Sequence, residues 1–335
     1  MERLAPLTTL RLGGPAARMV EARTEGELAE AVRSAYEPLL VLAGGSNVVI
    51  ADEGFPGTVV RVLTRGVERS GTRLVVQAGE SWDELVERCV AAGLQGFECL
   101  SGIPGSVGAT PIQNVGAYGQ EVAETVASVR VLDRASGQVT EMSPAECGFG
   151  YRTSVFKYRD RHVVLAVTFD LREDGRSGPV RYAELARALD VPVGGTAPLA
   201  DVREAVLALR RGKGMVIDPA DPDSVSAGSF FTNPILEPDE FARLQARTDE
   251  SPPAFPEPDG RIKTSAAWLI QHAGYDRGYG NGRVGISTKH TLALVNRGDA
   301  TAAELLALAR EIAGGVRERY GVALHPEPVL VGNDW

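Results

Sequence analysis

Residues 227–234 read AGSFFTNP, which sets one serine hydroxyl between a bare stretch of backbone and two aromatic side chains. A surface turn would rarely add Phe230 and Phe231, and a buried strand would rarely open with Gly228. The combination predicts that the Ser229 hydroxyl lies at the floor of a pocket. Whether it takes part in a reaction depends on the other groups that the fold brings to it.

Three charged residues are candidates for chemistry at such a pocket. Arg152, in FGYRTSVFK, is either an arginine packed for structural reasons among aromatic side chains or a guanidinium fork aimed at a carboxylate. Lys213, in RRGK, is either a solvated helix end that complements the helix dipole or a cation that grips phosphate. Glu327 stands between two prolines in LHPEP and is either an exposed acid at a strand end or a functional carboxylate.

Two glycine-rich segments could bring backbone groups close to a ligand. Residues 102–119 read GIPGSVGATPIQNVGAYG, and residues 44–47 read GGSN. Glycine lets backbone N–H and C=O groups approach a flat or anionic ligand, so one segment could serve a pyrophosphate and the other a planar ring. A long irregular loop is the plainer interpretation, although four Ile and Val side chains in the longer segment indicate that it is not merely solvated. Neither segment matches the GxxxxGK[ST] pattern of a P-loop.

The composition narrows the class of protein and of ligand. The chain has 335 residues, of which 44% are hydrophobic and 24% charged, and a net charge of -9. This charge argues against nucleic-acid binding, which needs a basic face, and requires local cations to hold any anionic ligand. Three cysteines without a CxxC pair predict reduced, buried thiols, and no metal-ligand spacing is present. With no signal peptide and no apolar run of about 18 residues, the protein is expected to be cytoplasmic and not inserted in a membrane.

Capping and periodicity predict the elements that must position these groups. Helices are expected to begin at capping boxes at Thr24, Ser81 and Thr301. Further helices are expected after Pro144, Asp201 and Pro238 and over TSAAWLIQHAG. Strands are expected over 39–43, 58–62, 73–79, the hairpin 128–142 and 162–171, and later around Phe230, over LALVN and in the Pro-interrupted C-terminal stretch. Both kinds of element occur throughout without repeats, so the predicted fold class is α+β in more than one domain.

Taken in order, GGSNV, IPGSVGATPIQNVGAYG, FGYRTSVFK, AGSFFTNP and a C-terminal PE resemble the UDP-N-acetylenolpyruvoylglucosamine reductase family over nearly the whole chain. The long glycine-rich motif followed by GSFFxNP is the specific part. The resemblance implies an α+β fold of the vanillyl-alcohol-oxidase/PCMH type that binds FAD. It implies two flavin-binding domains, 1–64 (joined by the C-terminal strand 322–335) and 65–212, and a third, substrate-binding domain, 213–321.

The same resemblance implies a reaction. Such enzymes use NADPH to reduce FAD, and the enolpyruvyl group of UDP-N-acetylglucosamine enolpyruvate is then reduced to give UDP-N-acetylmuramate for peptidoglycan. By this resemblance Arg152 stabilises the negative charge that develops on the substrate carboxylate, with Glu327 as its polar partner. Ser229 donates a proton to the neighbouring carbon, because an enolate is basic enough to take it in a dry pocket. No histidine lies beside GGSN, so the FAD is expected to be non-covalent.

The resemblance also assigns two sets of binding residues, position by position. The FAD-binding set is Gly44, Gly45, Ser46, Asn47, Val48, Pro104, Gly105, Ser106, Val107, Gly108, Thr110, Pro111, Gln113, Asn114, Gly116, Ala117, Tyr118, Gly119 and Arg210. The substrate-binding set is Tyr151, Tyr182, Lys213, Gly228, Asn233 and His290. Lys213 and Tyr182 would serve the diphosphate, and Tyr182, in VRYAEL, resembles the longer-loop, type I form. His325 stands where many relatives have an acid, and Ala267 where glycine is more usual.

Three alternatives remain open at this point. A flavin-dependent oxidase of small alcohols or sugars would keep the fold and consume oxygen. A regulator that binds flavin or sugar-nucleotide would have lost catalysis, which the presence of Ser229, Arg152 and Glu327 argues against. An acidic interaction protein would hold no cofactor and would be colourless. The small-molecule enzyme is the favoured interpretation, acting as a monomer with no nucleic-acid partner.

Overall fold

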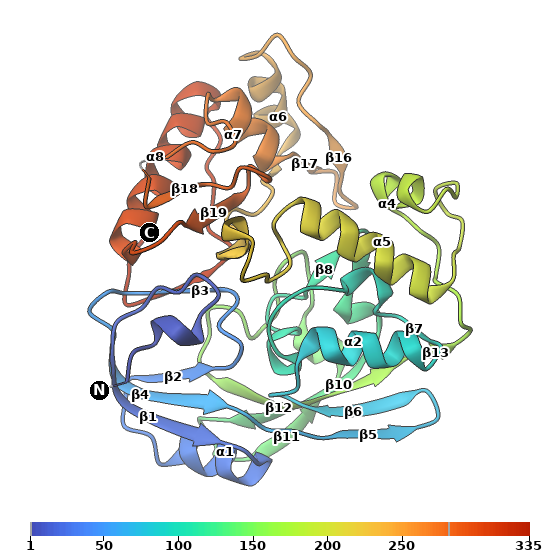
Figure 1. The fold of residues 1–335 in the computed structure, drawn as a ribbon, viewed down its shortest axis with the longest axis vertical. Coiled ribbons are helices and arrows are strands. Elements are labelled where there is room, and N and C mark those ends of the chain that lie inside the picture. Colours follow the sequence, from blue (N-terminus) through green and yellow to red (C-terminus); the bar gives the residue numbers. More distant parts are fainter. Residues whose placement is uncertain (1, 281) are drawn as a thin grey trace. The chain divides into compact units, whose positions relative to one another are not determined.

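The computed structural model describes residues 2–280 and 282–335, and the chain divides into two compact units. Unit 1 contains Glu2, Ala16–Gly45 and Phe55–Gly212. Unit 2 contains Arg3–Pro15, Ser46–Gly54 and Lys213–Trp335. The finer division into three domains stays a prediction. Figure 1 shows the elements of both units, coloured along the chain.

Two sheets form the frame of unit 1 (Figure 1). The first is parallel, with strand order β1 (Ala16–Ala22), β4 (Phe55–Val62) and β2 (Leu39–Leu42). The second is antiparallel, with strand order β11 (Val139–Met142), β10 (Val126–Asp133), β12 (His162–Asp170), β6 (Arg73–Gln77) and β5 (Val67–Ser70). The predicted hairpin is therefore β10–β11, and the predicted strands of this region are confirmed.

The helices of unit 1 are α1 (Glu25–Arg33), α2 (Trp82–Ala91), α3 (Pro144–Cys147), α4 (Ala183–Ala188) and α5 (Leu199–Gly212). Its short elements are β7 (Leu94–Gln95) paired with β13 (Arg172–Glu173), β8 (Gly116–Ala117) paired with β9 (Gln120–Glu121), and the 3-10 turns η2 (Glu98–Leu100), η3 (Val107–Ala109) and η4 (Val122–Glu124).

Helix α2 begins where it was predicted, but for a different reason. The side chain of Ser81 makes no capping hydrogen bond, so the capping box expected there is wrong. Instead the Trp82 amide donates to the carbonyl of Gly105 at 3.1 Å, and Ser81 forms a bridge with Ser106. The start of the helix is thus held by the glycine-rich segment, a partner far along the chain.

An aromatic cluster lies at the centre of unit 1. The rings of Trp82 and Phe97 meet edge to face with centroids 4.9 Å apart, and those of Phe97 and Phe169 do the same at 4.9 Å. All three side chains are fully buried. Edge-to-face pairs add to the stabilisation from burial, so this cluster ties α2 to the antiparallel sheet through β12.

Unit 2 is built from small sheets and α-helices (Figure 1). Its sheets are β14 (Ser226–Ser229) with β19 (Ala293–Asn296) and β18 (Val284–Ile286), β15 (Ile235–Leu236) with β17 (Ile262–Lys263) and β16 (Phe255–Pro256), and β20 (Val329–Val331) with β3 (Val48–Ile50). Its helices are α6 (Pro238–Gln245), α7 (Ala266–His272) and α8 (Ala302–Tyr320), and its 3-10 turns are η1 (Ala5–Leu7) and η5 (Pro222–Ser224).

Helix α8 confirms the sequence prediction at both ends. At its start, Thr301 and Glu304 form the expected reciprocal capping box. Asp52 adds two further acceptors, because its carboxylate receives the amides of Ala302 at 2.8 Å and Ala303 at 3.0 Å. The helix ends at Gly321, whose left-handed φ of 75° suits glycine.

The predicted thiol state also agrees with the structure. Cys89, Cys99 and Cys147 are free and buried. Burial raises the pKa of Cys89 and of Cys99 to about 12, and that of Cys147 to about 11. All three therefore stay protonated at neutral pH and act as small apolar side chains.

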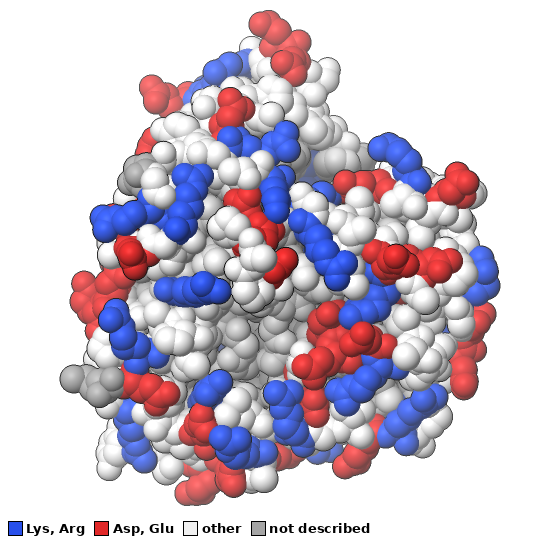
Figure 2. Space-filling view, viewed as in Figure 1, with Lys and Arg blue, Asp and Glu red and all other residues white. Residues whose placement is uncertain are grey.

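On the face shown in Figure 2, basic and acidic side chains alternate over the surface, so the net charge of -9 does not gather there into one acidic field. Every helix in the described range is too short or too polar to span a bilayer.

Replacing Phe169 with Ala should lower the free energy of unfolding by about 3–5 kcal/mol, because it leaves a cavity beside Phe97 and Trp82. Urea unfolding followed by tryptophan fluorescence would measure the change. Val139→Ala is the matched control, since that β11 side chain is 43% exposed and should shift stability by no more than about 0.5 kcal/mol. Equal effects of the two changes would contradict the role of the cluster.

Candidate functional site

The two glycine-rich segments meet in unit 1, at Gly44 and Gly105. A Cβ placed on Gly44 would lie 2.6 Å from the Cα of Gly105, a separation that real Cβ atoms do not reach. Gly105 itself has a φ of 115°, in the region that favours glycine. The contact is therefore one of backbone against backbone, and the approach of these backbone groups to a ligand stays a prediction.

Ser106 stands out within the longer segment. Its hydroxyl is buried, and among the described residues it has no hydrogen-bond partner. A buried hydroxyl without a partner is costly, so such a group in a native fold calls for an explanation. The backbone nitrogen of Ser106 would lie 3.4 Å from a Cβ placed on Gly44, so this residue belongs to the place where the two segments meet.

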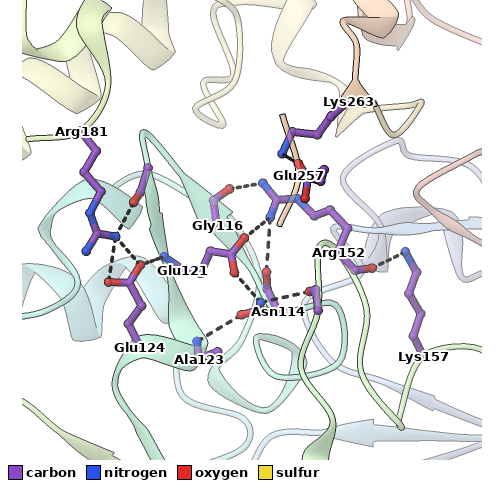
Figure 3. Close-up of polar contacts among 12 residues, drawn as sticks. Asn114, Gly116, Glu121, Ala123, Glu124, Arg152, Lys157, Arg181, Glu257 and Lys263 are labelled. Carbon is purple, nitrogen blue, oxygen red and sulfur yellow. Dashed lines mark hydrogen bonds and ion pairs between the residues drawn. The ribbon is translucent and has the colours of Figure 1, made fainter. Parts of the chain in front are cut away.

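Arg152 is held by carbonyl groups of the same segment, as Figure 3 shows. Its guanidinium donates to the backbone oxygen of Asn114 at 3.3 Å and to that of Gly116. It also lies over the ring of Tyr151, 5.3 Å from the centroid, and 4.0 Å from a carboxylate oxygen of Glu121. Arg152 thus both stacks on an aromatic ring and lies at the glycine-rich segment, so the two interpretations of its role are compatible.

The backbone of Arg152 is unusual as well. Its φ is 52°, a left-handed conformation that a non-glycine residue adopts only when its surroundings enforce it. Lys157, which is buried, donates to the Arg152 carbonyl at 2.9 Å and so helps to fix that turn. Lys157 was not predicted as a site residue, although it lies in the same FGYRTSVFK motif. A single sequence gives no sign that a lysine is buried.

Asn114 joins the glycine-rich segment to the turn that carries Arg152 (Figure 3). It is 1% exposed, and its carboxamide makes three hydrogen bonds. The amide nitrogen donates to the Glu121 carboxylate at 2.7 Å and to the Gly150 carbonyl at 3.1 Å, and the oxygen accepts from the Ala123 amide at 3.1 Å. Asn114, predicted only as a ligand contact, is therefore also a structural hub.

Helix α5 brings Arg210 to the end of the same segment. Burial lowers the pKa of the Arg210 guanidinium, while the nearby Tyr118 and Asp83 raise it. Burial raises the pKa of Tyr118 to about 12, although the charge of Arg210 opposes this. The ring of Tyr182, which is 47% exposed, meets Tyr118 edge to face with centroids 5.6 Å apart. Arg210 and Tyr118, predicted to bind FAD, thus lie close to Tyr182, predicted to bind the substrate, within unit 1.

In unit 2, Ser229 and Glu327 lie on adjacent segments. The Glu327 amide donates to the carbonyl of Phe230 at 2.8 Å, and Phe231 forms a bridge with Pro326. Phe230 and Phe231 are each 1% exposed and belong to the core of unit 2, so they anchor the segment from behind. Ser229 and Glu327 are both half-buried.

The second half of the GGSN motif lies beside Glu327. The side-chain nitrogen of Asn47 donates to the Glu327 carbonyl at 3.4 Å, and the Val329 amide donates to the Asn47 carbonyl at 2.9 Å. From there β3 and β20 run parallel. The motif therefore divides between the units, with Gly44 and Gly45 in unit 1 and Ser46 and Asn47 in unit 2.

Two predicted substrate-binding residues of unit 2 have defined local roles. The Nδ1 of His290 accepts from the Leu292 amide at 3.0 Å. The Leu292 carbonyl in turn accepts from the Phe230 amide at 2.7 Å, so Leu292 links His290 to the segment that carries Ser229. The side-chain oxygen of Asn233 accepts from the amide of Ala266 at 3.0 Å, at the start of α7.

The remaining predicted residues divide in the same way. Gly228 has a φ of 72° and precedes Ser229, and Lys213 is half-buried at the first position of unit 2. Arg152 belongs to unit 1, whereas Ser229 and Glu327 belong to unit 2. The structure brings Ser229 and Glu327 together, and the convergence of all three stays a prediction.

Comparison with known proteins adds to this geometry. Residues 16–143 match the FAD binding domain family, and residues 219–331 match the family described as UDP-N-acetylenolpyruvoylglucosamine reductase, C-terminal domain. The UDP-N-acetylenolpyruvoylglucosamine reductase of Thermobifida fusca is 59% identical, over 98% of this chain and 96% of that protein. The protein of the same name from Streptomyces coelicolor is 57% identical, over 98% and 89%.

A solved structure is similar over the same length. The crystal structure of UDP-N-acetylenolpyruvylglucosamine reductase from Thermus caldophilus covers 98% of this chain and 97% of its own, with a TM-score of 0.70 and 28% identity. The similarity therefore spans both units.

Replacing Asn114 with Ala should lower the free energy of unfolding by about 2–3 kcal/mol, because it leaves buried polar groups without partners. Chemical denaturation would measure this. Gln138→Ala removes an exposed amide from unit 1 and should change stability by less than about 0.5 kcal/mol. An Asn114→Ala protein as stable as the parent would exclude the role as a hub.

Proposed function

Because this chain belongs to the UDP-N-acetylenolpyruvoylglucosamine reductase family, we propose that it reduces UDP-N-acetylglucosamine enolpyruvate to UDP-N-acetylmuramate in peptidoglycan synthesis. The observation that carries the proposal is the 59% identity with a reductase over 98% of this chain. FAD is the cofactor and NADPH the co-substrate. The proposal includes a non-covalent FAD, a cytoplasmic location, a monomer and no nucleic-acid partner.

The residues of unit 1 fit a flavin nucleotide. The backbone contact between Gly44 and Gly105 leaves no room for a Cβ on Gly44. The buried Ser106 hydroxyl there has no partner among the described residues, so a phosphate oxygen would complete its hydrogen bonding. The fold is accordingly of the vanillyl-alcohol-oxidase/PCMH type expected from the sequence.

We propose that Arg152 binds the carboxylate of the substrate. Bound FAD would supply the hydride that comes from NADPH, and Arg152 would face the negative charge that then develops on the substrate carboxylate. A guanidinium has five N–H donors, so it can serve loop carbonyls and a ligand carboxylate together. The Asn114 and Gly116 carbonyls orient it in advance, and a preoriented cation stabilises developing charge more than one that must reorganise.

Ser229 is the proposed proton donor to the substrate carbon, and Glu327 the proposed polar partner of the carboxylate group. What supports this pairing is the hydrogen bond from the Glu327 amide to the Phe230 carbonyl at 2.8 Å, which holds the two segments in register. The buried Phe230 and Phe231 keep the Ser229 backbone from moving when the proton is transferred.

The sugar-nucleotide is the proposed ligand of the residues around these groups. Lys213 and Tyr182 would bind the diphosphate, with Tyr151, Gly228, Asn233 and His290 as further contacts. Since the Asn233 oxygen is used at the start of α7, its NH₂ group would face the ligand. Tyr182 lies at the start of α4 in the segment that resembles the type I form.

The visible spectrum of the purified protein tests the proposed function. The protein should show flavin absorption, lose it when NADPH is added without oxygen, and regain it when the enolpyruvyl sugar-nucleotide is added. Recolouring by oxygen alone, with no response to the sugar-nucleotide, would favour an oxidase.

Replacing Ser229 with Ala should leave FAD bound and reducible by NADPH, but slow substrate turnover by about 10²–10⁴-fold, the usual contribution of a proton donor. Stopped-flow absorbance separates the two half-reactions. Ser251→Ala is the matched control, because Ser251 is exposed and belongs to unit 2. Unchanged turnover in Ser229→Ala would remove this residue from its role.

Replacing Arg152 with Lys should cost much of the turnover rate, because an ammonium lacks the planar fork that binds a carboxylate through two bonds. A loss of about tenfold or more in kcat is expected, with NADPH still reducing the flavin. Arg159→Lys serves as the control, since that arginine is exposed and follows the same motif. A rate near that of the parent would count against the carboxylate clamp.

A further inference from the structure

A partly open cavity of about 360 Å³ lies at the surface of unit 2, and the function above does not use it. One wall is α6 with the chain that follows it, another is residues 232–236, and a third is the segment after α8. Its volume is in the range of sites that hold small organic molecules.

The polar lining of this cavity carries mainly hydrogen-bond donors. Arg243, Arg247 and His325 all line it, whereas Glu240 is its one carboxylate among the described lining residues. Glu240 already accepts the Glu237 amide at 2.9 Å, and Arg243 is paired with Asp239 at 2.7 Å. With Asp239 neutralising Arg243, Arg247 is the cation among the described lining residues that remains to meet an anionic ligand.

Arg247 is the least neutralised of these side chains. Among the described residues it has no carboxylate partner, unlike Arg243. Its guanidinium lies against the backbone of Gly321, since a Cβ placed there would be 3.1 Å from Nη1. Gly321 has no side chain, so it leaves room for the guanidinium at this wall.

The walls of the cavity continue the two segments that carry Ser229 and Glu327. The Thr232 amide donates to the His325 carbonyl at 3.1 Å, next to the bridge between Phe231 and Pro326. A molecule bound here would therefore contact both segments where Thr232 and His325 are joined by their hydrogen bond.

We infer that this cavity is a binding site for a small organic phosphate. A phosphate monoester has three terminal oxygens and close to two negative charges. It can therefore accept hydrogen bonds from two arginines and an imidazole together, whereas a carboxylate ligand has only two oxygens and one charge. Pro234, Leu236 and Val322 offer apolar surface for the organic part. The site is separate from the catalytic residues, and the inference does not depend on the proposed reaction.

Calorimetric titration of the FAD-loaded full chain tests the inference, with inorganic phosphate, phenyl phosphate and benzoate as probes. Phenyl phosphate should bind more tightly than either of the others, by about threefold or more, because only it has both the dianion and the ring. Arg247→Gln should weaken phenyl phosphate at least tenfold, since a charge-assisted pair is lost. Benzoate binding as tightly as phenyl phosphate would overturn the assignment to phosphate.

Two control variants separate this site from other cations. Arg277→Gln removes the same charge from an exposed position in unit 2 outside the cavity and should leave affinity unchanged. Lys213→Gln should also leave it unchanged, because Lys213 is the proposed diphosphate contact of the substrate. If Lys213→Gln abolishes binding while Arg247→Gln preserves it, the inference is wrong.

Hydrogen exchange gives an independent localisation. Phenyl phosphate should slow amide exchange in residues 322–327 and 232–236 of the parent protein and not of Arg247→Gln. If Arg247→Gln lowers the melting temperature yet keeps the parent affinity and exchange pattern, Arg247 only complements the C-terminus of α8, and the inference fails.

Discussion

Close approach of backbone to backbone is the constraint on which the site in unit 1 depends. Gly44 meets Gly105 where no Cβ could fit, and a Cβ on Gly116 would lie 2.9 Å from a guanidinium nitrogen of Arg152. Because no side chains intervene, carbonyl groups of the 102–119 segment can hold the arginine directly. The Ser106 hydroxyl beside this contact is buried and has no hydrogen-bond partner among the described residues. The glycines therefore allow the close backbone approach and the direct support of Arg152.

In unit 2, hydrogen bonds between two segments and a buried aromatic pair position Ser229 and Glu327. Hydrogen bonds from the Glu327 amide to the Phe230 carbonyl and from the Thr232 amide to the His325 carbonyl set two distant segments in register, and the buried Phe230 and Phe231 anchor one of them in the core. The sequence had suggested that Phe230 and Phe231 surround the hydroxyl of Ser229. They lie in the core instead, so their contribution is to anchor the serine backbone. A proton donor benefits from such rigidity, because transfer requires a fixed distance to the reacting carbon.

Charge is used locally in this acidic chain. Arg210 is buried beside Tyr118, and Arg152 donates to two backbone carbonyls and lies 4.0 Å from a carboxylate oxygen of Glu121. Both guanidinium groups of unit 1 are therefore positioned by specific neighbours rather than by the overall charge of the chain. Near α6 the two arginines differ, because Arg243 is paired with Asp239 whereas Arg247 packs against the backbone of Gly321.

The sequence by itself determined the α+β class, the positions of most helices and strands, the buried thiols and the family. These follow from local chemistry, since caps such as Thr301, periodic apolar residues and glycine motifs act within a few residues. Only the tertiary structure decided which groups meet. Lys157 on the Arg152 carbonyl, Asn114 between two turns and Asn47 beside Glu327 depend on contacts across the fold, the last between residues 280 positions apart. The cap predicted at Ser81 is absent, and the start of that helix is held instead by a hydrogen bond from the Trp82 amide to the distant Gly105 carbonyl. Hydrogen-bond partners that are far apart in sequence are chosen by packing, which no local pattern records.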